Sequence, residues 1–412
     1  MFLGIPIRML RPALLSILIT FTFVPIMGLP YTADDGVNRN WPTVGFGEAI
    51  SEAIRLQRTW IFEQGRFFPG GSIYALSMWN IFDSRVAYMT YLALLGMLVV
   101  ALVGYLTWRA CGSGQVAALA VVATGACMQV RFGYLDGIAS FGGLVPYTIV
   151  LTLISALLAA HILRGGSRWY ALPIVVLWSL AITAYEVSLL MLPAVLLMLL
   201  VTGPSLRKRA LWLWAGLPLV VPAALQLGIT FYLRRRELPL APAYQIDLGG
   251  PVGTTFGKQF TAALPFAQQG IADAPINWTV SIFLILVLAV PVVLTWRPWL
   301  STPVTIPQRV SIGLMAAGLW AWVVPSVLAA VTVRWQGELF WGQGYIYLPY
   351  EFVGFGLVLA GVGTLLRANA HRPWARIAFV VLFACLVAGC AVTAGVNIVG
   401  VGSIVPGPQG PG

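Results

Sequence analysis

The segment 86–108 reads VAYMTYLALLGMLVVALVGYLTW and contains no charged residue. As a helix rising about 1.5 Å per residue, it is long enough to cross the roughly 30 Å hydrocarbon core of a bilayer. Over the whole chain, 59% of the residues are hydrophobic and 9% are charged. A soluble domain has about 25% charged residues. The chain therefore has too little polar surface for a soluble globule, and we expect an all-α integral membrane protein.

Similar apolar runs lie on both sides of this segment, and no window between them alternates as a membrane-barrel strand does. Together they predict about eleven transmembrane helices in one domain covering 1–398. The predicted spans are 12–30, 86–108, 115–131, 140–163, 169–186, 187–203, 210–232, 277–296, 310–333, 346–366 and 376–398. The fifth and sixth form one apolar stretch, too long for a single helix, which we divide at Ala184-Tyr185-Glu186-Val187. The tail 399–412 is rich in Gly and Pro and is expected to be disordered.

Charge predicts the orientation of these helices. A cytoplasmic N-terminus places five short loops on the cytoplasmic side, at 109–114, 164–168, 204–209, 297–309 and 367–375. These loops, their edges and the N-terminal segment carry 13 basic residues and no acid, so all 13 acids lie at or near the opposite face. The positive-inside rule selects this topology and explains the net charge of +11 without a nucleic-acid partner. We expect a multi-pass protein of the plasma (inner) membrane, with its polar function on the outer face.

The first outer loop, 31–85, begins with an acidic pair. Asp34 and Asp35 follow the first span directly, where two carboxylates can bind a cation or act as a general base. With Glu48 or Glu52 they could hold a divalent cation, although the sequence has no ligand pattern that decides this. The alternative is an ordinary turn, in which Asp is common.

A short amphipathic helix is predicted next in this loop. One face carries Glu48, Glu52 and Arg55, and the opposite face carries an apolar stripe of Ala49, Ala53, Leu56 and Trp60. The segment is too polar to span a bilayer. It therefore lies along the outer leaflet, or it packs as a surface helix on the other loops.

The order of these features resembles a known family. A first span, an acidic pair, a surface helix, the element Gln64-Gly65-Arg66-Phe67 and then the second span are similar to the GT-C superfamily of membrane glycosyltransferases, in particular to bacterial proteins of the O-antigen glucosyltransferase type. The resemblance covers about the first hundred residues, and the remainder matches only as a hydropathy profile. It implies a sugar donor carried on a polyprenyl phosphate or diphosphate. It also implies a catalytic acid in the first outer loop, so that Asp34 or Asp35 would deprotonate or position the acceptor hydroxyl.

Such a donor needs cations near the bilayer surface. Arg234, Arg235 and Arg236 follow the seventh span at the start of the long outer loop 233–276, on the side where topology disfavours basic clusters. Guanidinium groups suit phosphate oxygens, so the triplet is a candidate donor-binding site, together with Arg66. The alternative is an interfacial anchor that reaches the lipid headgroups. Arg131, in a short outer loop, is a further candidate, or forms only a local ion pair with Asp136.

Four more candidates lie near the outer ends of later spans. Glu186 has no obvious partner nearby in the sequence, and Glu351 follows Pro349 and Tyr350. Ionisable groups at membrane depth are functional candidates, although both acids are alternatively hydrated at the surface. The loop 334–345 mixes aromatic rings with amides and acids, including Glu338 and Trp341. It is a candidate acceptor surface, or part of the aromatic belt found at membrane interfaces.

Three functions remain open at this stage. A glycosyltransferase would move a sugar from a polyprenyl-phosphate-linked donor to a glycan or lipid acceptor. A transporter or lipid-linked-sugar flippase would need polar groups near the bilayer midplane and broken helices. The prolines within the spans allow such breaks, but very few charges lie in mid-span. A non-catalytic scaffold of envelope assembly would have no need of the outer carboxylates.

Overall fold

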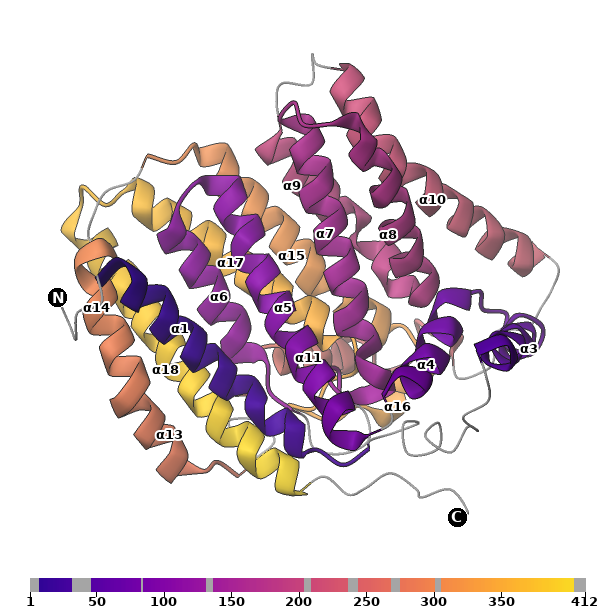
Figure 1. Cartoon of the computed structure of the whole chain (residues 1–412), viewed down its shortest axis with the longest axis horizontal. Coiled ribbons are helices and arrows are strands. Elements are labelled where there is room, and N and C mark those ends of the chain that lie inside the picture. The colour runs from indigo at the N-terminus through magenta and orange to yellow at the C-terminus, as the bar shows by residue number, and fades with distance from the viewer. Residues whose placement is uncertain are drawn as a thin grey trace.

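The computed structural model describes residues 7–31, 46–82, 84–130, 136–203, 209–235, 244–267, 275–300 and 305–403. Within these ranges the chain is a bundle of helices with no strand, and an isolated bridge joins Ile246 to Thr332 (Figure 1). The predicted all-α class is therefore confirmed. Asp34, Asp35, Arg131 and Arg236 lie outside the described residues, as does most of the tail 399–412.

Among the described residues, eight helices are long and apolar enough to cross a membrane. They agree with a multi-pass membrane protein. They are built from α1 (Ile7–Phe23) with a 3-10 turn (Val24–Gly28), α5 (Arg85–Cys111), a 3-10 turn (Ser140–Gly143) with α7 (Leu144–Leu163), α10 (Arg209–Arg235), α13 (Trp278–Leu284) continuing through a π turn (Ile285–Ala289) into α14 (Val290–Leu300), α15 (Gln308–Ala330), α17 (Leu348–Ala368) and α18 (Pro373–Ser403).

The other three predicted spans coincide with shorter apolar helices. These are α6 (Gly114–Cys127), α8 (Ala171–Ala184), which follows a 3-10 turn (Arg168–Tyr170), and α9 (Leu192–Thr202), which follows a 3-10 turn (Glu186–Met191). A helix of 14 residues, such as α6 or α8, is about 21 Å long. Length alone therefore assigns eight crossings, and the total of about eleven stays a prediction.

Among the described helices, α15 and α17 share the most extensive contact. A Cβ added to Gly318 would lie 2.6 Å from the carbonyl oxygen of Gly354, and one added to Gly354 would lie 2.6 Å from the amide nitrogen of Trp322. One end of this contact is joined by a hydrogen bond of 2.7 Å from Ser311 Oγ to the carbonyl oxygen of Gly361. Small residues let membrane helices approach in this way, so that backbone packing replaces the hydrophobic effect that lipid cannot supply.

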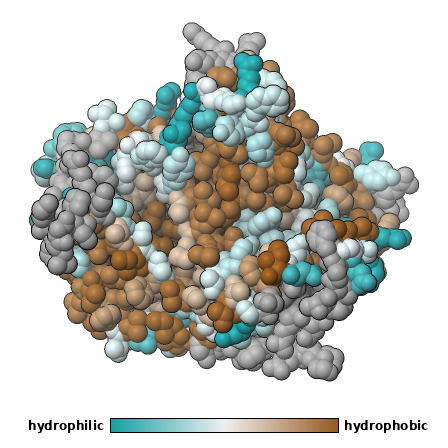
Figure 2. All heavy atoms as spheres, viewed as in Figure 1, coloured by the Kyte–Doolittle hydropathy of each residue, from teal (hydrophilic) through white to brown (hydrophobic). Residues whose placement is uncertain are grey.

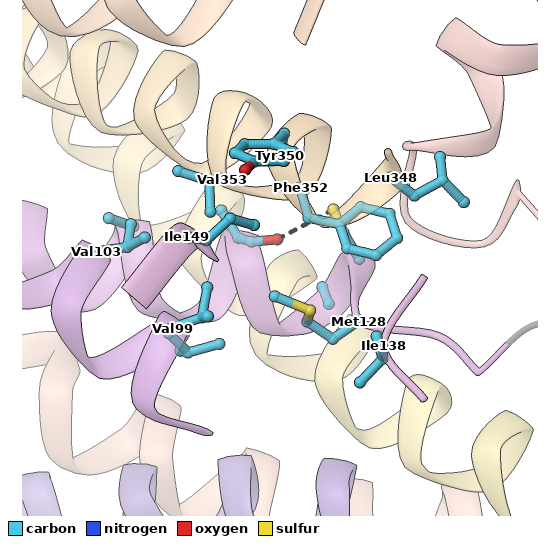
Figure 3. Packing of buried hydrophobic residues seen from close by; sticks show 14 of the residues in the cluster. Val99, Val103, Met128, Ile138, Ile149, Leu348, Tyr350, Phe352 and Val353 are labelled. Carbon is cyan, nitrogen blue, oxygen red and sulfur yellow. Dashed lines mark hydrogen bonds between the residues drawn. The ribbon is translucent and has the colours of Figure 1, made fainter. Parts of the chain in front are cut away.

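Apolar side chains fill the interior around the first turns of α17. Figure 3 shows this packing, with Leu348, Tyr350, Phe352 and Val353 beside Val99 and Val103 of α5, Ile149 of α7, and Met128 and Ile138 from the segment between α6 and α7. All of them are buried. The Tyr350 hydroxyl is hydrogen-bonded to Thr148 Oγ1 at 2.7 Å and to Ser188 Oγ at 2.6 Å. This part of α17 is therefore fixed by both apolar and polar contacts.

Four short helices gather at one end of the bundle, the lower end in Figure 1: α3 (Phe46–Gln64), α4 (Pro69–Ile81), α11 (Val252–Ala262) and α16 (Val333–Glu338). We call this the acid-bearing end, because the acids that the structure describes lie on these helices or on segments in contact with them. The opposite end, where α5 turns into α6 and α7 ends, is the acid-free end. In Figure 2 hydrophobic residues dominate the middle of the visible face, and hydrophilic ones gather toward its margins.

The predicted amphipathic helix is present as α3. Ala53 is buried, Leu56 and Trp60 are half-buried, and the helix packs against α4. On the polar face, Arg55 Nε donates to Glu52 Oε2 at 2.7 Å, as the sequence pattern predicts. Another helix at this end, α11, lies within the segment 233–276, for which the sequence predicts only a long outer loop.

Candidate functional site

An ion pair between Arg66 and Glu186 lies at the acid-bearing end. Arg66 Nε donates to Glu186 Oε1 at 3.0 Å and Arg66 Nη2 donates to Glu186 Oε2 at 2.5 Å. The two residues are 120 positions apart in the sequence. Their side chains are 17% and 31% exposed, so the pair is partly buried but still reached by solvent. Two parallel hydrogen bonds fix the guanidinium plane as well as its position.

Two glycines bring this pair together. The first turn of α4 contains Gly70 and Gly71, and it lies against the end of α8. A Cβ at Gly70 would lie 2.8 Å from the amide nitrogen of Ala184, and one at Gly71 would lie 2.6 Å from the carbonyl oxygen of the same residue. Only glycine permits so close an approach of two backbones. The contact holds the segment that carries Arg66 beside Tyr185, where the backbone becomes extended (φ −152°, ψ 118°) and the apolar run is interrupted.

Three aromatic rings surround the Arg66 guanidinium. Its central carbon lies 5.4 Å from the ring centroid of Trp60, 4.8 Å from that of Phe68 and 4.9 Å from that of Tyr244. We call these three residues the aromatic cage. A cation over an aromatic face is attracted by the ring quadrupole, and more so where water is excluded. The cage therefore holds a permanent positive charge in a partly dry site.

The electrostatics keep this charge in place. Burial alone lowers the pKa of the Arg66 guanidinium, but the Glu186 carboxylate together with Tyr185 and Tyr347 raises it, so that the pKa lies above its ordinary value. Arg66 is therefore protonated at every physiological pH. A fixed cation with two parallel N–H donors matches either a carboxylate or a phosphate group.

A cluster of tyrosines adjoins the ion pair. Tyr185, directly before Glu186, packs against Tyr347 with ring centroids 5.9 Å apart. Tyr345 packs edge-on against Tyr347 with centroids 4.6 Å apart, and it stacks on Trp335 of α16. Burial raises the pKa of Tyr345 well above its usual range, so its phenol stays protonated and can donate a hydrogen bond. Rings and hydroxyls in this arrangement can stack on a sugar and bind its hydroxyl groups.

The network extends from the aromatic cage to the 334–345 loop. Arg334 Nη1 donates to the Tyr244 hydroxyl at 3.3 Å, and its Nε lies 3.0 Å from Glu338 Oε2. Tyr244 is placed there by the bridge next to it, in which the amide of Val333 donates to the carbonyl of Gln245 at 3.1 Å. Arg66 and Arg334 therefore both contact Tyr244, and Arg334 joins Glu338 to this network.

Glu351 lies beneath this surface and is fully buried. Its Oε1 accepts hydrogen bonds from Gln259 Nε2 of α11 at 3.1 Å and from Ser326 Oγ of α15 at 3.0 Å. Gln259 Oε1 in turn accepts from the backbone amide of Tyr345 at 2.7 Å. Hydration of Glu351 at the surface is thus excluded, because protein groups replace water around the carboxylate. Through Gln259 the acid positions the loop that carries the tyrosine cluster.

The structure brings some of the predicted site residues together and separates others. Arg66, Glu186 and Glu338 share one network, and Glu351 is joined to it through Gln259. Trp341 is 46% exposed and lies over α11, with its ring 3.1 Å from where a Cβ at Gly257 would be. Arg235 is exposed and lies over the ring of Phe231, at 5.0 Å from its centroid. It fits the interfacial-anchor alternative.

The remaining predicted site residues cannot be placed. Asp34, Asp35, Arg131 and Arg236 lie outside the described residues, and so does the side chain of Arg234. Tyr31, the last described residue before the acidic pair, packs against Tyr88 with centroids 5.8 Å apart. Asp136 Oδ1 accepts hydrogen bonds from the amides of Ile138 and Ala139, at 2.8 and 2.6 Å, and so shapes its own turn.

Within the described ranges no three His, Cys, Asp or Glu side chains gather closely enough to hold a metal ion. Glu48 and Glu52, the described half of the predicted ligand set, lie on the solvent-facing side of α3, where Glu52 is paired with Arg55. Whether Asp34 and Asp35 bind a divalent cation therefore stays a prediction.

Several site residues were missed from the sequence. Tyr185, Tyr244, Tyr347 and Gln259 have no spacing that marks them, because their neighbours in the site come from distant segments. Two signals were available. Tyr185 is adjacent to Glu186, and Val252, Phe256 and Phe260 recur at the four-residue spacing of an amphipathic helix, which would have predicted α11.

The comparisons with known proteins add no functional assignment to this geometry. No family model matches the chain, and no curated protein sequence matches it significantly. A function for the chain therefore has to come from its own residues.

Proposed function

We propose that this chain is a membrane glycosyltransferase of GT-C type, which moves a sugar from a polyprenyl-phosphate-linked donor to a glycan or lipid acceptor. In this proposal the eleven apolar helices all cross the plasma (inner) membrane, the N-terminus is cytoplasmic, and the acid-bearing end faces outward. Nucleotide sugars are cytoplasmic, so an outward-facing site needs a lipid-linked donor. The resemblance of the first hundred residues to the GT-C superfamily supports the same function.

The observation that carries the proposal is the paired guanidinium of Arg66 inside the aromatic cage. A phosphate presents two oxygens to a guanidinium much as the Glu186 carboxylate does. The donor phosphate would therefore take the place of Glu186, and the displaced carboxylate would become available to sugar hydroxyls. The tyrosine cluster and Trp335 supply stacking surfaces and hydroxyl donors next to this point.

The catalytic step is assigned to the acidic pair. Asp34 or Asp35 would accept the proton of the acceptor hydroxyl while the acceptor oxygen attacks the anomeric carbon and the polyprenyl phosphate leaves with the bonding electrons. General-base catalysis of this kind typically contributes about 10²–10⁴-fold to a rate.

The test replaces Asp34 and Asp35 by Asn, singly and together, in the native host. Envelope glycan composition is compared with that of a deletion strain, at equal protein levels. We expect the Asn variants to reproduce the glycan defect of the deletion. Arg66→Lys, which keeps the charge but loses the two-pronged geometry, should weaken transfer when the donor is scarce and be partly rescued by excess donor. If both Asn variants restore the glycan fully, the carboxylate mechanism is wrong.

A transporter is the second candidate, because Glu351 is a buried carboxylate hydrogen-bonded between three helices. The two functions differ in their products. Purified glycosyltransferase incubated with a lipid-linked sugar and an acceptor releases polyprenyl phosphate, whereas a transporter moves the intact lipid across a vesicle membrane and releases none.

A further inference from the structure

An apolar groove lies on the side of the bundle, away from the candidate site. It is bounded by α1, α5 and α6 along its length and by Trp296 of α14 at one end, and its volume is about 540 Å³. Leu15 and Ile19 form one wall, and Val100 and Val121 form the other. At its floor α5 and α6 touch, because a Cβ at Gly104 would lie 2.5 Å from Val121 Cγ2.

The groove starts at the acid-free end and stops partway along the helices. On α5 its lining runs from Met97 to Trp108, which is about 16 Å of helix. One leaflet contributes about half of the roughly 30 Å hydrocarbon thickness. The groove therefore has the depth of a single leaflet. Tyr105, Trp108 and Trp296 lie toward its acid-free end, as aromatic residues do at a membrane interface.

Three arginines belong to the segments that line the acid-free end of the groove, which we call its mouth. Each is the sequence neighbour of a lining residue: Arg11 of Pro12, Arg109 of Trp108, and Arg297 of Trp296. Arg11 Nε donates to the carbonyl oxygen of Thr295 at 2.9 Å, which joins the start of α1 to α14. The segments 1–33, 84–135 and 274–337, to which these arginines belong, contain no acid. The positive charge at the mouth is therefore not balanced by carboxylates of the same segments.

We propose that this groove binds one acyl chain of an anionic glycerophospholipid, whose phosphate lies among Arg11, Arg109 and Arg297. The depth of the groove matches one leaflet, its walls are apolar as an acyl chain requires, and its mouth is cationic as an anionic headgroup requires. Basic pockets between membrane helices on one side of a bilayer bind anionic headgroups for the same reason. A free phosphate would use only the mouth, and a zwitterionic lipid would gain less from the arginines.

The experiment uses the purified full chain in detergent and a phosphatidylglycerol that carries a photoreactive diazirine in one acyl chain. After illumination the labelled residues are mapped by peptide mass spectrometry. We expect labelling within 15–20, 97–105 and 117–121. Unlabelled phosphatidylglycerol should compete at concentrations at least about fivefold lower than phosphatidylcholine, since each arginine near a membrane surface contributes about fivefold in affinity.

Two kinds of variant separate the headgroup from the chain. Replacing Arg11, Arg109 and Arg297 by Gln should abolish the preference for phosphatidylglycerol, whereas labelling of the apolar groove walls should remain. Ala101→Trp places a large side chain at an exposed position within the groove and should remove labelling there. Leu94→Trp is its matched control, because Leu94 is exposed on the same helix two turns away and does not line the groove.

Three outcomes overturn the proposal. The label could spread evenly over exposed apolar residues of α10 and α13, as for bulk lipid. Phosphatidylcholine could compete as well as phosphatidylglycerol. Labelling in the groove could persist in Ala101→Trp. If Ala101→Trp does not fold, the arginine variants and the label map decide the question alone.

Discussion

Arg66 and Arg164 lie at opposite ends of the bundle, and their guanidinium groups have different partners. Arg66 has a carboxylate held by two hydrogen bonds and three aromatic rings around it. Arg164, at the acid-free end, donates to the backbone carbonyl of Arg109, and its side chain is exposed. At the first end charge is balanced inside the protein and its geometry is fixed. At the second end, the segment 137–185 that carries Arg164 contains no acid.

This difference suggests what each end can bind. A partly buried ion pair is costly to break, so a ligand that replaces Glu186 must offer the same two-oxygen geometry. Exposed arginines adapt to any anion and select mainly by charge. A specific substrate site fits the acid-bearing end, and lipid binding fits the acid-free end.

The largest expected effect comes from Arg66→Met. It leaves the partly buried Glu186 carboxylate without its cation, which should cost about 3–5 kcal/mol of unfolding free energy. The loss is measured by SDS-induced unfolding of the purified protein, with thermal melting as a second probe. Arg55→Met is the matched control, because Arg55 is paired with Glu52 on the solvent-facing side of α3, and we expect no measurable change. Similar losses for the two variants would remove the contrast between buried and exposed pairs.

Glu351→Leu tests how far the fixed geometry of the acid-bearing end extends into the interior. The change leaves Gln259 Nε2 without the carboxylate that accepts its hydrogen bond, whereas Ser326 Oγ keeps the carbonyl oxygen of Trp322 as an acceptor. We expect a cost of about 2–3 kcal/mol. Glu351→Gln keeps an acceptor oxygen and should retain most of the stability. Thermal melting measures the stability of both variants, and the rate of protease cleavage within 244–262 measures whether α11 stays in place. If both changes are neutral, Glu351 does not hold α11 in place.

Gly71→Ala should be next in size. The new Cβ would lie 2.6 Å from the Ala184 carbonyl oxygen, so α4 must shift, at a cost of about 1–2 kcal/mol. The shift should also weaken the Arg66–Glu186 pair. Thermal melting measures the loss, and a double-mutant cycle with Glu186→Gln measures the coupling. Gly47→Ala on α3 is the control, because its Cβ would meet nothing within 4 Å and alanine favours the helix.

The smallest effect is expected at the acid-free end. Arg164→Gln removes a hydrogen bond from an exposed side chain to a backbone carbonyl, and should change the unfolding free energy by less than about 0.5 kcal/mol. Its melting temperature in detergent should match that of the parent. A loss as large as that of Arg66→Met would show that both ends depend equally on their arginines.

The sequence predicted the long-range plan of the molecule but not the contacts of the site. Apolar runs in the sequence located the eight long apolar helices and the three shorter ones. They could do so because the hydrophobicity of a segment depends only on its own residues. The periodicity of 48–60 located α3 for the same reason. By contrast, Glu186 had no visible partner, since its partner is 120 residues away and local spacing carries no information about it.

The arginine candidates show the same limit. The triplet 234–236 stood out because three cations are adjacent, yet Arg235 lies over Phe231 of its own helix. Arg66 is a single cation that only its family-like element marked, and the fold gives it a carboxylate and an aromatic cage. Local charge density is visible in the sequence, whereas the convergence of segments around Arg66 becomes visible only in the fold.

The 120-residue separation of Arg66 and Glu186 also sets a schedule for biogenesis. At a synthesis rate of about 5–20 residues per second, the ribosome needs roughly 6–24 seconds to make the chain between them. During that time the nascent Arg66 has no Glu186 to bind, so α3 and α4 are without this partner while the chain that forms α5, α6, α7 and α8 is made. The ion pair can close only after α8 has been made, so the contact between α4 and α8 and the cage around Arg66 are completed together, and not while α3 and α4 are being synthesised.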